Sequence, residues 1–509
     1  MSMEQSKTQP AVQAGTPGET ATVGLEVGGV HSKDDLSWLD LWALNPETRA
    51  YLKAYRRDAA CSQASQRREG AGDGSQEIGT PEKLRKLQRA LYRKAKAEPA
   101  YRFWSLYGEL TRLDLLEYAL QLVQRNGGAP GVDGQTIKSI TATPDNRQQW
   151  LEQLQKELQT KTYRPSPVRR VYIPKPDGGQ RPLGIPTVKD RVVQMAMLLV
   201  LAPIFEADFH PHSYGFRPRR NAHQALDAII EGLRQGKLEV VDADLSKYFD
   251  TIPHSQLMKL LARRISDGSV LHLLRLWLDA PIQEETRDGK RRVLPNRQGV
   301  PQGGVISPLL ANVYLNKLDW AVNDPNEPGH PALVRYADDF VILCAPGQGT
   351  QLMERLRRWL EARGLKLNEE KTRKVHSREG FKFLGFCVRW QPSRVSGRWY
   401  AHIEPSAKSQ QRLRAKVRKQ LNHWTLHRRI PEAVEELNKV LRGWSGYFHY
   451  RQSTRVFSNT QRWVRDRMRR WLWRKHKCTK ALWSDYPNQL LHERYGLWRL
   501  PTHVSWKAH

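Results

Sequence analysis

Two adjacent aspartates interrupt an otherwise strand-like segment, RYADDFVIL, at residues 335–343. Successive side chains of a strand point to opposite faces, so Asp338 and Asp339 can converge only at or near the tight turn of a hairpin. Two carboxylates held together repel each other and raise each other's pKa unless a cation lies between them. Mg²⁺ is commonly bound by one or two carboxylates together with substrate phosphates. The pair therefore predicts half of a magnesium site.

A third carboxylate, Asp244, follows a short apolar run in VVDADLSKYFDTIPH at residues 240–254. Together with Asp338 and Asp339 it could hold two metal ions about 4 Å apart, the geometry for in-line phosphoryl transfer. The alternative interpretation makes the paired aspartates turn residues and Asp244 an edge or cap residue. An isolated Asp-Asp pair would favour that alternative, whereas the presence of both segments in this order favours the metal site.

The chain around these aspartates has the pattern of an α+β domain with an antiparallel sheet. Residues 236–390 contain the short strands LEVVDADL, ALVRY, FVILC and FKFLGFCV, separated by helical segments. Residues 110–235 alternate helical patterns with short strands, and a helical period dominates after residue 405. The apolar stretch at 192–205 contains Gln194 and Pro203 and is shorter than a membrane span. It predicts a buried core helix, and we expect no membrane partner.

The N-terminal region predicts disorder. Residues 1–33 lack aromatic residues and are rich in Gly, Thr, Gln and Pro, so they bury too little to order themselves. Thr80 and Pro81 suit the N-cap and first position of a helix, and ordered structure is expected to begin there.

The net charge of +31, from 83 Lys and Arg against 52 Asp and Glu, predicts a polyanionic partner. Residues 405–480 alone carry 21 Lys or Arg and 4 Asp or Glu. Aromatic residues alternate with these charges, which suits base stacking and phosphate neutralisation and favours nucleic-acid binding over a merely solvated face. The four cysteines form no C-x-x-C pair, which argues against a zinc site and fits a reducing cytosol.

The two aspartate segments occur together with RPLGIPTVKDRVVQ at 181–194 and QGVPQGGVISPLLANVYLNKLD at 298–319. In this order they resemble the motifs of group II intron-encoded reverse transcriptases, also called maturases, over residues 81–500. The resemblance implies an α+β right-hand polymerase, with fingers and an antiparallel palm sheet followed by a helical thumb. It implies the following division: flexible extension 1–80, fingers 81–238, palm 239–395, thumb or maturase domain 396–475 and a short DNA-binding tail 476–509.

The same resemblance assigns roles to single residues of an RNA-directed DNA polymerase. Asp244, Asp338 and Asp339 would be the catalytic ligands of two Mg²⁺. The nucleotide would be bound by Lys175 and Arg181 at the triphosphate, Phe249 as a steric gate that selects dNTPs, Gln302 at the sugar and base, and Lys371 near the pyrophosphate. The primer grip would comprise Phe383, Leu384 and Gly385. From the residues alone, surface cations, a Gly-rich loop and a core Tyr-Phe pair remain the plain alternatives.

Nucleic-acid contacts are predicted from the same resemblance and from the basic C-terminal region. The positions are Arg217, Arg219, Arg220, Arg442, Trp444, Arg462, Arg465, Arg469 and Arg470. The implied partners are intron RNA in a ribonucleoprotein, an RNA template with a DNA primer, target DNA and dNTPs. The implied location is the bacterial cytosol or nucleoid, and the sequence predicts no oligomeric state.

The sequence stops without the Cys- and His-bearing endonuclease module of many relatives, so we expect priming from existing nicks or nascent strands. Two other function classes remain open. One is an RNA-binding splicing cofactor with a vestigial polymerase, against which the intact aspartate triad argues. The other is a domesticated reverse transcriptase serving defence or repair, which the long N-terminal extension leaves open.

Overall fold

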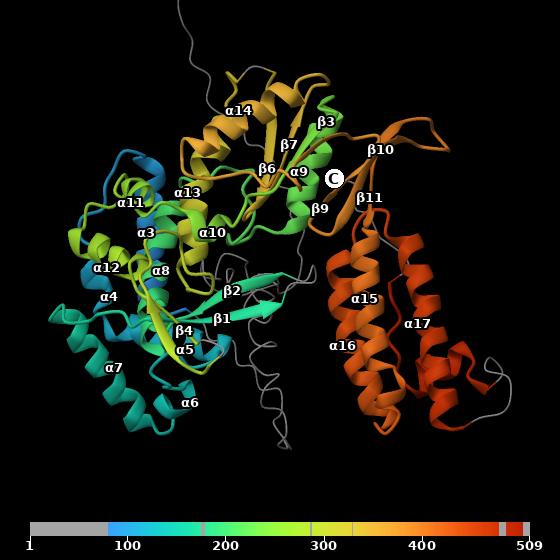
Figure 1. The fold of residues 1–509 in the computed structure, drawn as a ribbon, viewed down its shortest axis with the longest axis horizontal. Coiled ribbons are helices and arrows are strands. Elements are labelled where there is room, and N and C mark those ends of the chain that lie inside the picture. Colours follow the sequence, from blue (N-terminus) through green and yellow to red (C-terminus); the bar gives the residue numbers. More distant parts are fainter. Residues whose placement is uncertain (1–79, 175–178, 286–287, 328, 478–484, 502–509) are drawn as a thin grey trace, which may run out of the picture. The chain divides into compact units, whose positions relative to one another are not determined.

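The computed structural model describes residues 80–174, 179–285, 288–327, 329–477 and 485–501. The predicted flexible extension, apart from Thr80, lies outside these residues, as does Lys175. Helix α3 (Glu82–Ala97) opens the described chain one residue later than predicted (Figure 1). Pro81 rather than Thr80 occupies the N-cap position, and the Thr80 hydroxyl forms a hydrogen bond with the Tyr118 hydroxyl instead.

The central sheet has the strand order β6-β7-β3-β8 and is antiparallel throughout. Its strands are β6 (Ala332–Tyr336), β7 (Asp339–Cys344), β3 (Glu239–Ala243) and β8 (Arg373–His376). Their apolar side chains alternate between two hydrophobic clusters, with Val241 and Ile342 in one and Val240 and Val341 in the other. The sheet is therefore covered on both faces, and the predicted antiparallel palm sheet is confirmed.

The first hydrophobic cluster gathers the N-terminal helices around α8 (Val188–Glu206). Helices α3, α4 (Tyr107–Leu110) and α5 (Leu113–Asn126) all contact α8, and α6 (Ile137–Ile140) and α7 (Pro144–Gln159) follow α5. Nearly every side chain of α8 is buried, which confirms the predicted core helix. Among the described residues, no helix has the length and apolar character needed to cross a bilayer.

A second sheet, of order β2-β1-β4-β5, lies beside these helices. The hairpin of β1 (Val168–Pro174) and β2 (Gln180–Ile185) pairs with β4 (Ile282–Glu285) and β5 (Arg291–Leu294). The connections between this sheet and the palm strands form α9 (Ala222–Arg234), α10 (Tyr248–Thr251), α11 (His254–Leu261), α12 (Gly268–Leu278) and α13 (Ser307–Val322). Helix α14 (Gly349–Glu361) connects the palm strands β7 and β8.

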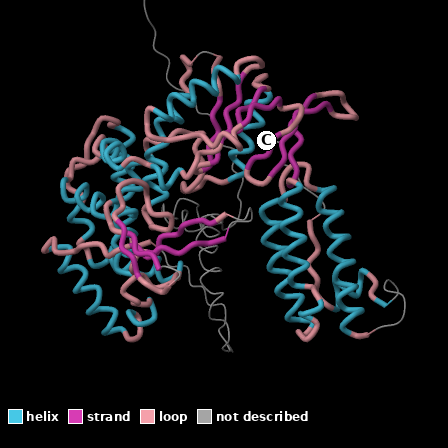
Figure 2. Tube along the Cα trace, viewed as in Figure 1, coloured by secondary structure: helices cyan, strands magenta, loops and turns pink. Residues whose placement is uncertain are grey.

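The C-terminal third begins with a small sheet of order β11-β10-β9, formed by β9 (Phe381–Phe383), β10 (Phe386–Pro392) and β11 (Trp399–Pro405). The described chain beyond Pro405 has only helices and loops (Figure 2). These helices are α15 (Ala407–Gln420), η2 (His423–Thr425), α16 (Ile430–Phe448), α17 (Thr454–Lys475) and the π-turn η3 (Leu490–Arg494), with α15 contacting both α16 and α17.

Two of the predicted domain boundaries fall within packed structure. The boundary at 395–396 lies in the connection between the paired strands β10 and β11. The predicted tail after residue 475 contains Tyr486, Leu491, Leu497 and Leu500, all buried in the same cluster as α16 and α17. Residues 485–500 therefore belong to the packed helical region rather than to a separate tail.

Candidate active site

The hairpin that carries the paired aspartates has the form that the sequence predicted. Strands β6 and β7 pair up to Tyr336 opposite Asp339, so Ala337 and Asp338 form a two-residue turn. Ala337 has a φ of 58°, in the left-handed region that residues with a side chain seldom adopt. Such turns match the twist of paired strands, and the strained residue lies directly before Asp338.

The strand pairing brings the third carboxylate to this turn. Strands β3 and β7 pair up to Ala243 opposite Phe340, so the next step of the register places Asp244 beside Asp339. Asp244 is held from its other side by Asn368 and Lys371. Its carboxylate accepts a hydrogen bond from Asn368 Nδ2 at 3.2 Å and forms an ion pair with Lys371 Nζ at 3.2 Å.

The pKa of each of the two paired aspartates is raised by burial and by neighbouring carboxylates. The pKa of Asp338 is raised by burial and by Asp244, although Arg181 and Arg335 oppose the shift. The pKa of Asp339 rises to about 7 through loss of solvent around its carboxyl and repulsion from Asp338, Asp244 and Asp242. Crowded anions of this kind suit a divalent cation.

The aspartates are not gathered as a ready ligand cluster. In the part of the chain that the structure describes, no three His, Cys, Asp or Glu side chains are arranged to hold a metal ion. The Asp244 carboxylate faces Lys371 and Asn368 instead. The donor set and its mutual repulsion nonetheless fit a hard divalent ion, which would have to compete with Lys371 for Asp244.

A cleft of about 1160 Å³ opens at this turn. It brings together residues that lie far apart in the sequence and that were predicted to bind metal or nucleotide. These lining residues are Arg181, Asp244, Phe249, Gln302, Asp338 and Lys371.

The walls of the cleft are tied together through backbone contacts. The Gly184 N–H, in β2, donates to the Gln302 carbonyl at 2.7 Å, and the Val300 N–H donates to the Phe249 carbonyl at 2.6 Å. Gly299 has a φ of 87°, and a Cβ there would lie 2.8 Å from the Asp250 backbone. Only glycine fits this close approach, so the Gly-rich loop is shaped by its packing. The Gln302 amide is also within 3.3 Å of the Asp250 carboxylate, which orients it.

The predicted primer grip is a tight turn between β9 and β10. Leu384 and Gly385 both have positive φ, 48° and 84°, as a two-residue hairpin of this twist requires. The Leu384 carbonyl accepts a hydrogen bond from the Tyr447 hydroxyl at 2.9 Å, and the Gly385 carbonyl accepts one from the Ser409 hydroxyl at 2.8 Å. Phe383 is buried in the core. Residues of α15 and α16 therefore fix this turn.

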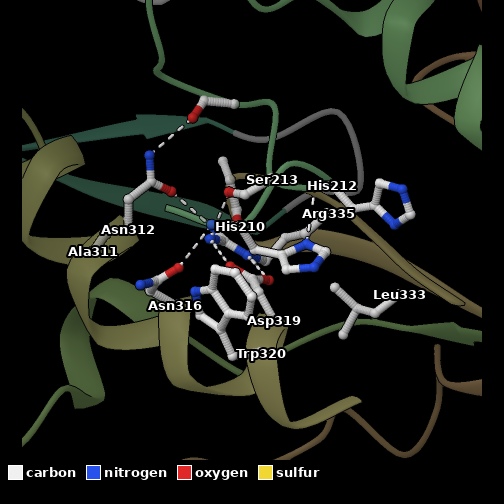
Figure 3. Close-up of polar contacts among 12 residues, drawn as sticks. His210, His212, Ser213, Ala311, Asn312, Asn316, Asp319, Trp320, Leu333 and Arg335 are labelled. Atoms are coloured by element: carbon white, nitrogen blue, oxygen red, sulfur yellow. Dashed lines mark hydrogen bonds and ion pairs between the residues drawn. The ribbon is translucent and has the colours of Figure 1, made fainter. Parts of the chain in front are cut away.

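A buried ion pair lies beside the Ala337–Asp338 turn, which carries the predicted catalytic aspartates and is named the catalytic turn for that reason (Figure 3). Arg335 and Asp319 are both 0 % exposed and are joined at 2.7 and 2.6 Å. The Arg335 guanidinium also donates to Asn312, to Ser213 and, at 2.8 Å, to the Ala337 carbonyl. It thereby ties the peptide before Asp338 to α13. Arg335 and Asp319 both lie in motifs of the sequence, but the sequence analysis assigned neither a role. A charged residue inside an apolar strand or helix could have indicated a buried ion pair.

A second support comes from the loop at 210–217. Its Tyr214 N–H donates to the Arg335 carbonyl at 2.8 Å. A Cβ on Gly215 would lie 2.3 Å from the Ala337 nitrogen, so this glycine is packed directly against the catalytic turn. The sequence predicted nucleic-acid contact for Arg217, Arg219 and Arg220 of this region, whereas the structure shows that Tyr214 and Gly215 support the turn.

Two arginines predicted to contact nucleic acid are buried, which corrects that prediction for them. Arg217 is 3 % exposed and bonds Glu206 and the carbonyls of His210 and Ser213. Arg469 is 2 % exposed and bonds Asp466, Asn488 and the Tyr486 carbonyl. Their guanidinium groups serve internal packing because carboxylates and carbonyls surround them.

The other predicted contact residues reach the surface to differing extents. Trp444 packs partly buried between Phe448 and Phe457. Arg220 and Arg465 are half-buried, with Arg220 lying over the Tyr214 ring. The exposed members of the set are Arg219, Arg442, Arg462 and Arg470.

An antiparallel palm sheet carries three acidic residues at one end, and two of them, Asp244 and Asp338, line a cleft together with Arg181, Gln302 and Phe249. This arrangement defines a nucleotidyltransferase of the polymerase class. Comparison with known families agrees. Residues 173–388 match the family described as reverse transcriptase (RNA-dependent DNA polymerase), and residues 410–486 match the maturase-specific domain of group II introns. The chain belongs to the family of group II intron-encoded reverse transcriptases and maturases, and it is an RNA-directed DNA polymerase.

Two curated relatives illustrate the match. Protein YkfC of Escherichia coli K12 is 38 % identical over 59 % of this chain and 87 % of its own. The group II intron-encoded protein LtrA of Lactococcus lactis subsp. cremoris is 30 % identical over 56 % of this chain and 57 % of its own. A structure of telomerase from Candida albicans aligns with a TM-score of 0.37 and 14 % identity, over 64 % of this chain and 63 % of that chain.

Proposed function

We propose that this protein extends a DNA primer along an RNA template with two Mg²⁺ held by Asp244, Asp338 and Asp339. We further propose that it binds the RNA of its own intron to assist splicing and retrohoming, with target DNA and dNTPs as additional partners, in the bacterial cytosol. The observation that carries the proposal is the β3–β7 register, which sets Asp244 beside the Asp338–Asp339 turn at the cleft.

The metal and the triphosphate would meet at the end of the cleft where the aspartates lie. Bound Mg²⁺ would activate the primer 3′-OH and neutralise charge on the phosphates. Arg181 lies near enough to lower the pKa of Asp338, so its guanidinium is placed to bind a triphosphate beside that carboxylate. Lys371, now paired with Asp244, is assigned to the leaving pyrophosphate.

The sugar and base would meet fixed groups. Phe249 is 9 % exposed, and its backbone carbonyl accepts a hydrogen bond from the Val300 N–H. Its ring packs edge-on against the Tyr248 ring, with 5.4 Å between the ring centroids. A side chain held this rigidly can exclude a ribose 2′-OH by steric overlap, so Phe249 is assigned to selection of dNTPs. The Gln302 amide, oriented by Asp250, is assigned to the nucleotide itself.

Primer extension on an RNA template with dNTPs and Mg²⁺ tests this function. The wild type is compared with two variants. The first is Asp338→Ala plus Asp339→Ala, and the second is Glu370→Ala, which removes an exposed carboxylate directly before Lys371 in the sequence. We expect cDNA from the wild type and from the Glu370 variant only, with RNA binding equal in all three. A wild type that promotes splicing but makes no cDNA on any template would instead support the splicing-cofactor alternative.

A further inference from the structure

A second hollow, of about 770 Å³, shares no lining residue with the catalytic cleft. It is formed where the C-terminal ends of α3 and α8 meet the loop after α11 and the helices α13 and α14. We call it the basic pocket, because its lining includes Lys96, Arg263, Lys317 and Arg363.

The charge of the basic pocket is not balanced by its own carboxylates. Among the described residues that line it, Asp208 is the one acidic side chain, and it already forms an ion pair with Arg264 at 3.0 Å. The pKa of Lys317 is lowered by burial and by the nearby charges of Arg263 and Arg363. Cations crowded in a concave site repel one another, and an anionic ligand relieves that repulsion.

The basic pocket also presents fixed indole rings. Trp320 is 52 % exposed, yet its Nε1–H donates to the Asp208 carbonyl at 2.9 Å and its ring meets His210 edge-on at 4.7 Å (Figure 3). The Arg363 guanidinium lies 3.7 Å above the Trp359 ring. An exposed indole with a fixed orientation, next to several cations, is suited to stack a base while the cations bind its phosphates.

We propose that the basic pocket binds a single-stranded segment of the structured intron RNA, with phosphates at Arg263 and Lys317 and a base on Trp320. The proposal deepens the RNA-binding part of the proposed function and rests on it. Duplex DNA fits less well, because its bases are stacked within the helix and offer no free face to Trp320.

The test measures the affinity of the full-length protein for the RNA transcribed from the region that surrounds its own coding sequence, over a range of salt concentrations. Arg263→Gln plus Lys317→Gln removes two pocket charges. The matched control, Lys259→Gln plus Arg358→Gln, removes two exposed charges from α11 and α14 that do not line the pocket. Trp320→Leu removes the stacking surface without a charge.

We expect the pocket double variant to bind this RNA roughly tenfold more weakly at physiological salt, with a salt slope about 1.4 units shallower, since each lost phosphate contact on a single strand removes about 0.7. Trp320→Leu should weaken binding without changing the slope. Extension of a short primer on a short RNA template should be unchanged in all variants. The same variants should show no such loss on duplex DNA.

Three results would overturn the proposal: unchanged RNA affinity in the pocket variants, an equal loss in the control pair, or an equal loss on duplex DNA. The proposed function fails in a distinguishable way, because the wild type itself would then not bind this RNA.

Discussion

The Arg335–Asp319 ion pair links the catalytic turn to α13 through the Ala337 carbonyl. Breaking a buried pair by removing one partner leaves an uncompensated charge, typically at a cost of about 3–5 kcal/mol. Replacing both partners by apolar residues of similar size is often neutral for stability. Comparing a single with a double substitution therefore distinguishes two roles of this ion pair, one in the stability of the fold and one in positioning Asp338.

We predict that Arg335→Met plus Asp319→Leu folds with a melting temperature near that of the wild type but loses roughly ten- to a hundredfold in primer-extension rate, as about 1.4–2.8 kcal/mol of lost transition-state stabilisation implies. The Mg²⁺ concentration for half-maximal rate should rise, because the Ala337 peptide is no longer held. Arg335→Met alone should be destabilised. A double variant with wild-type rate and Mg²⁺ dependence would show that the pair serves stability only.

His210, which lies beside this network, makes the fold sensitive to acid. Burial and the charges of His212, Arg217 and Arg335 lower its pKa from 6.5 to about 4, against an opposing effect of Asp319. Between pH 6.5 and 4 the unfolded chain therefore binds a proton that the folded chain does not, and stability falls as the pH falls through this window.

We predict that the wild type loses stability between pH 7 and pH 5 and that His210→Asn loses less over the same range. Asn supplies an acceptor for the His212 N–H, which now bonds His210 Nδ1 at 3.0 Å. Urea unfolding at the two pH values provides the measurement. Equal losses in both proteins would mean that other groups, such as His212, control the acid sensitivity.

The sequence predicted the position of a charged or polar residue correctly where that residue lies in a motif beside a turn or a glycine. Asp244, Asp338, Arg181 and Gln302 stood in motifs beside turns and glycines, and the structure brings these four residues to one cleft, whereas Asp339 is exposed and does not line it. Arg217 and Arg469 looked like their exposed neighbours in sequence, because the acceptors that hold them include the Glu206 carboxylate and the Tyr486 carbonyl, 11 and 17 residues away. The spacing of residues near an arginine does not predict whether a distant carboxylate or carbonyl will bury its guanidinium group.

At the scale of elements, the catalytic hairpin is positioned by a loop whose Gly215 packs against it through the backbone. Gly215 has no room for a Cβ, because the Ala337 nitrogen would lie 2.3 Å away. A real Cβ at this position must push the loop or the turn aside. The hairpin itself was predictable because its two strands alternate regularly, whereas the loop that supports it was recognised only as a basic segment.

We predict that Gly215→Ala lowers the primer-extension rate at least tenfold while RNA binding is kept. The matched control is Gly443→Ala in α16, where no atom lies within 4 Å of the added Cβ and where Ala favours the helix by roughly 0.5–1 kcal/mol. The control should keep full activity. Wild-type activity in Gly215→Ala would mean that the turn tolerates displacement.

For the whole molecule, two hydrophobic clusters meet at the palm sheet, and the second continues from its strands into the C-terminal helices. The sequence predicted the antiparallel palm and the helical region, but it separated residues 476–509 as a tail. Leu491, Leu497 and Leu500 are spaced irregularly, so no helical or strand period marked them as core.

We predict that Leu497→Ala lowers the free energy of unfolding by about 2–5 kcal/mol, as expected for a buried leucine. Val395→Ala, at a side chain that is 98 % exposed, should change it by less than about 0.5 kcal/mol. Chemical denaturation followed by tryptophan fluorescence gives both values. An unchanged free energy of unfolding in Leu497→Ala would indicate that residues 485–500 form a separate tail.

We propose that Asp244, directly after β3, and Asp338 and Asp339, at the β6–β7 hairpin, together bind two divalent metal ions. Mn²⁺ binding, measured by electron paramagnetic resonance with an RNA template, a dideoxy-terminated primer and the next dNTP present, tests it directly. We predict two bound Mn²⁺ per wild-type protein, fewer in Asp244→Asn, and no change in Glu370→Ala. Full Mn²⁺ occupancy in Asp244→Asn would contradict it.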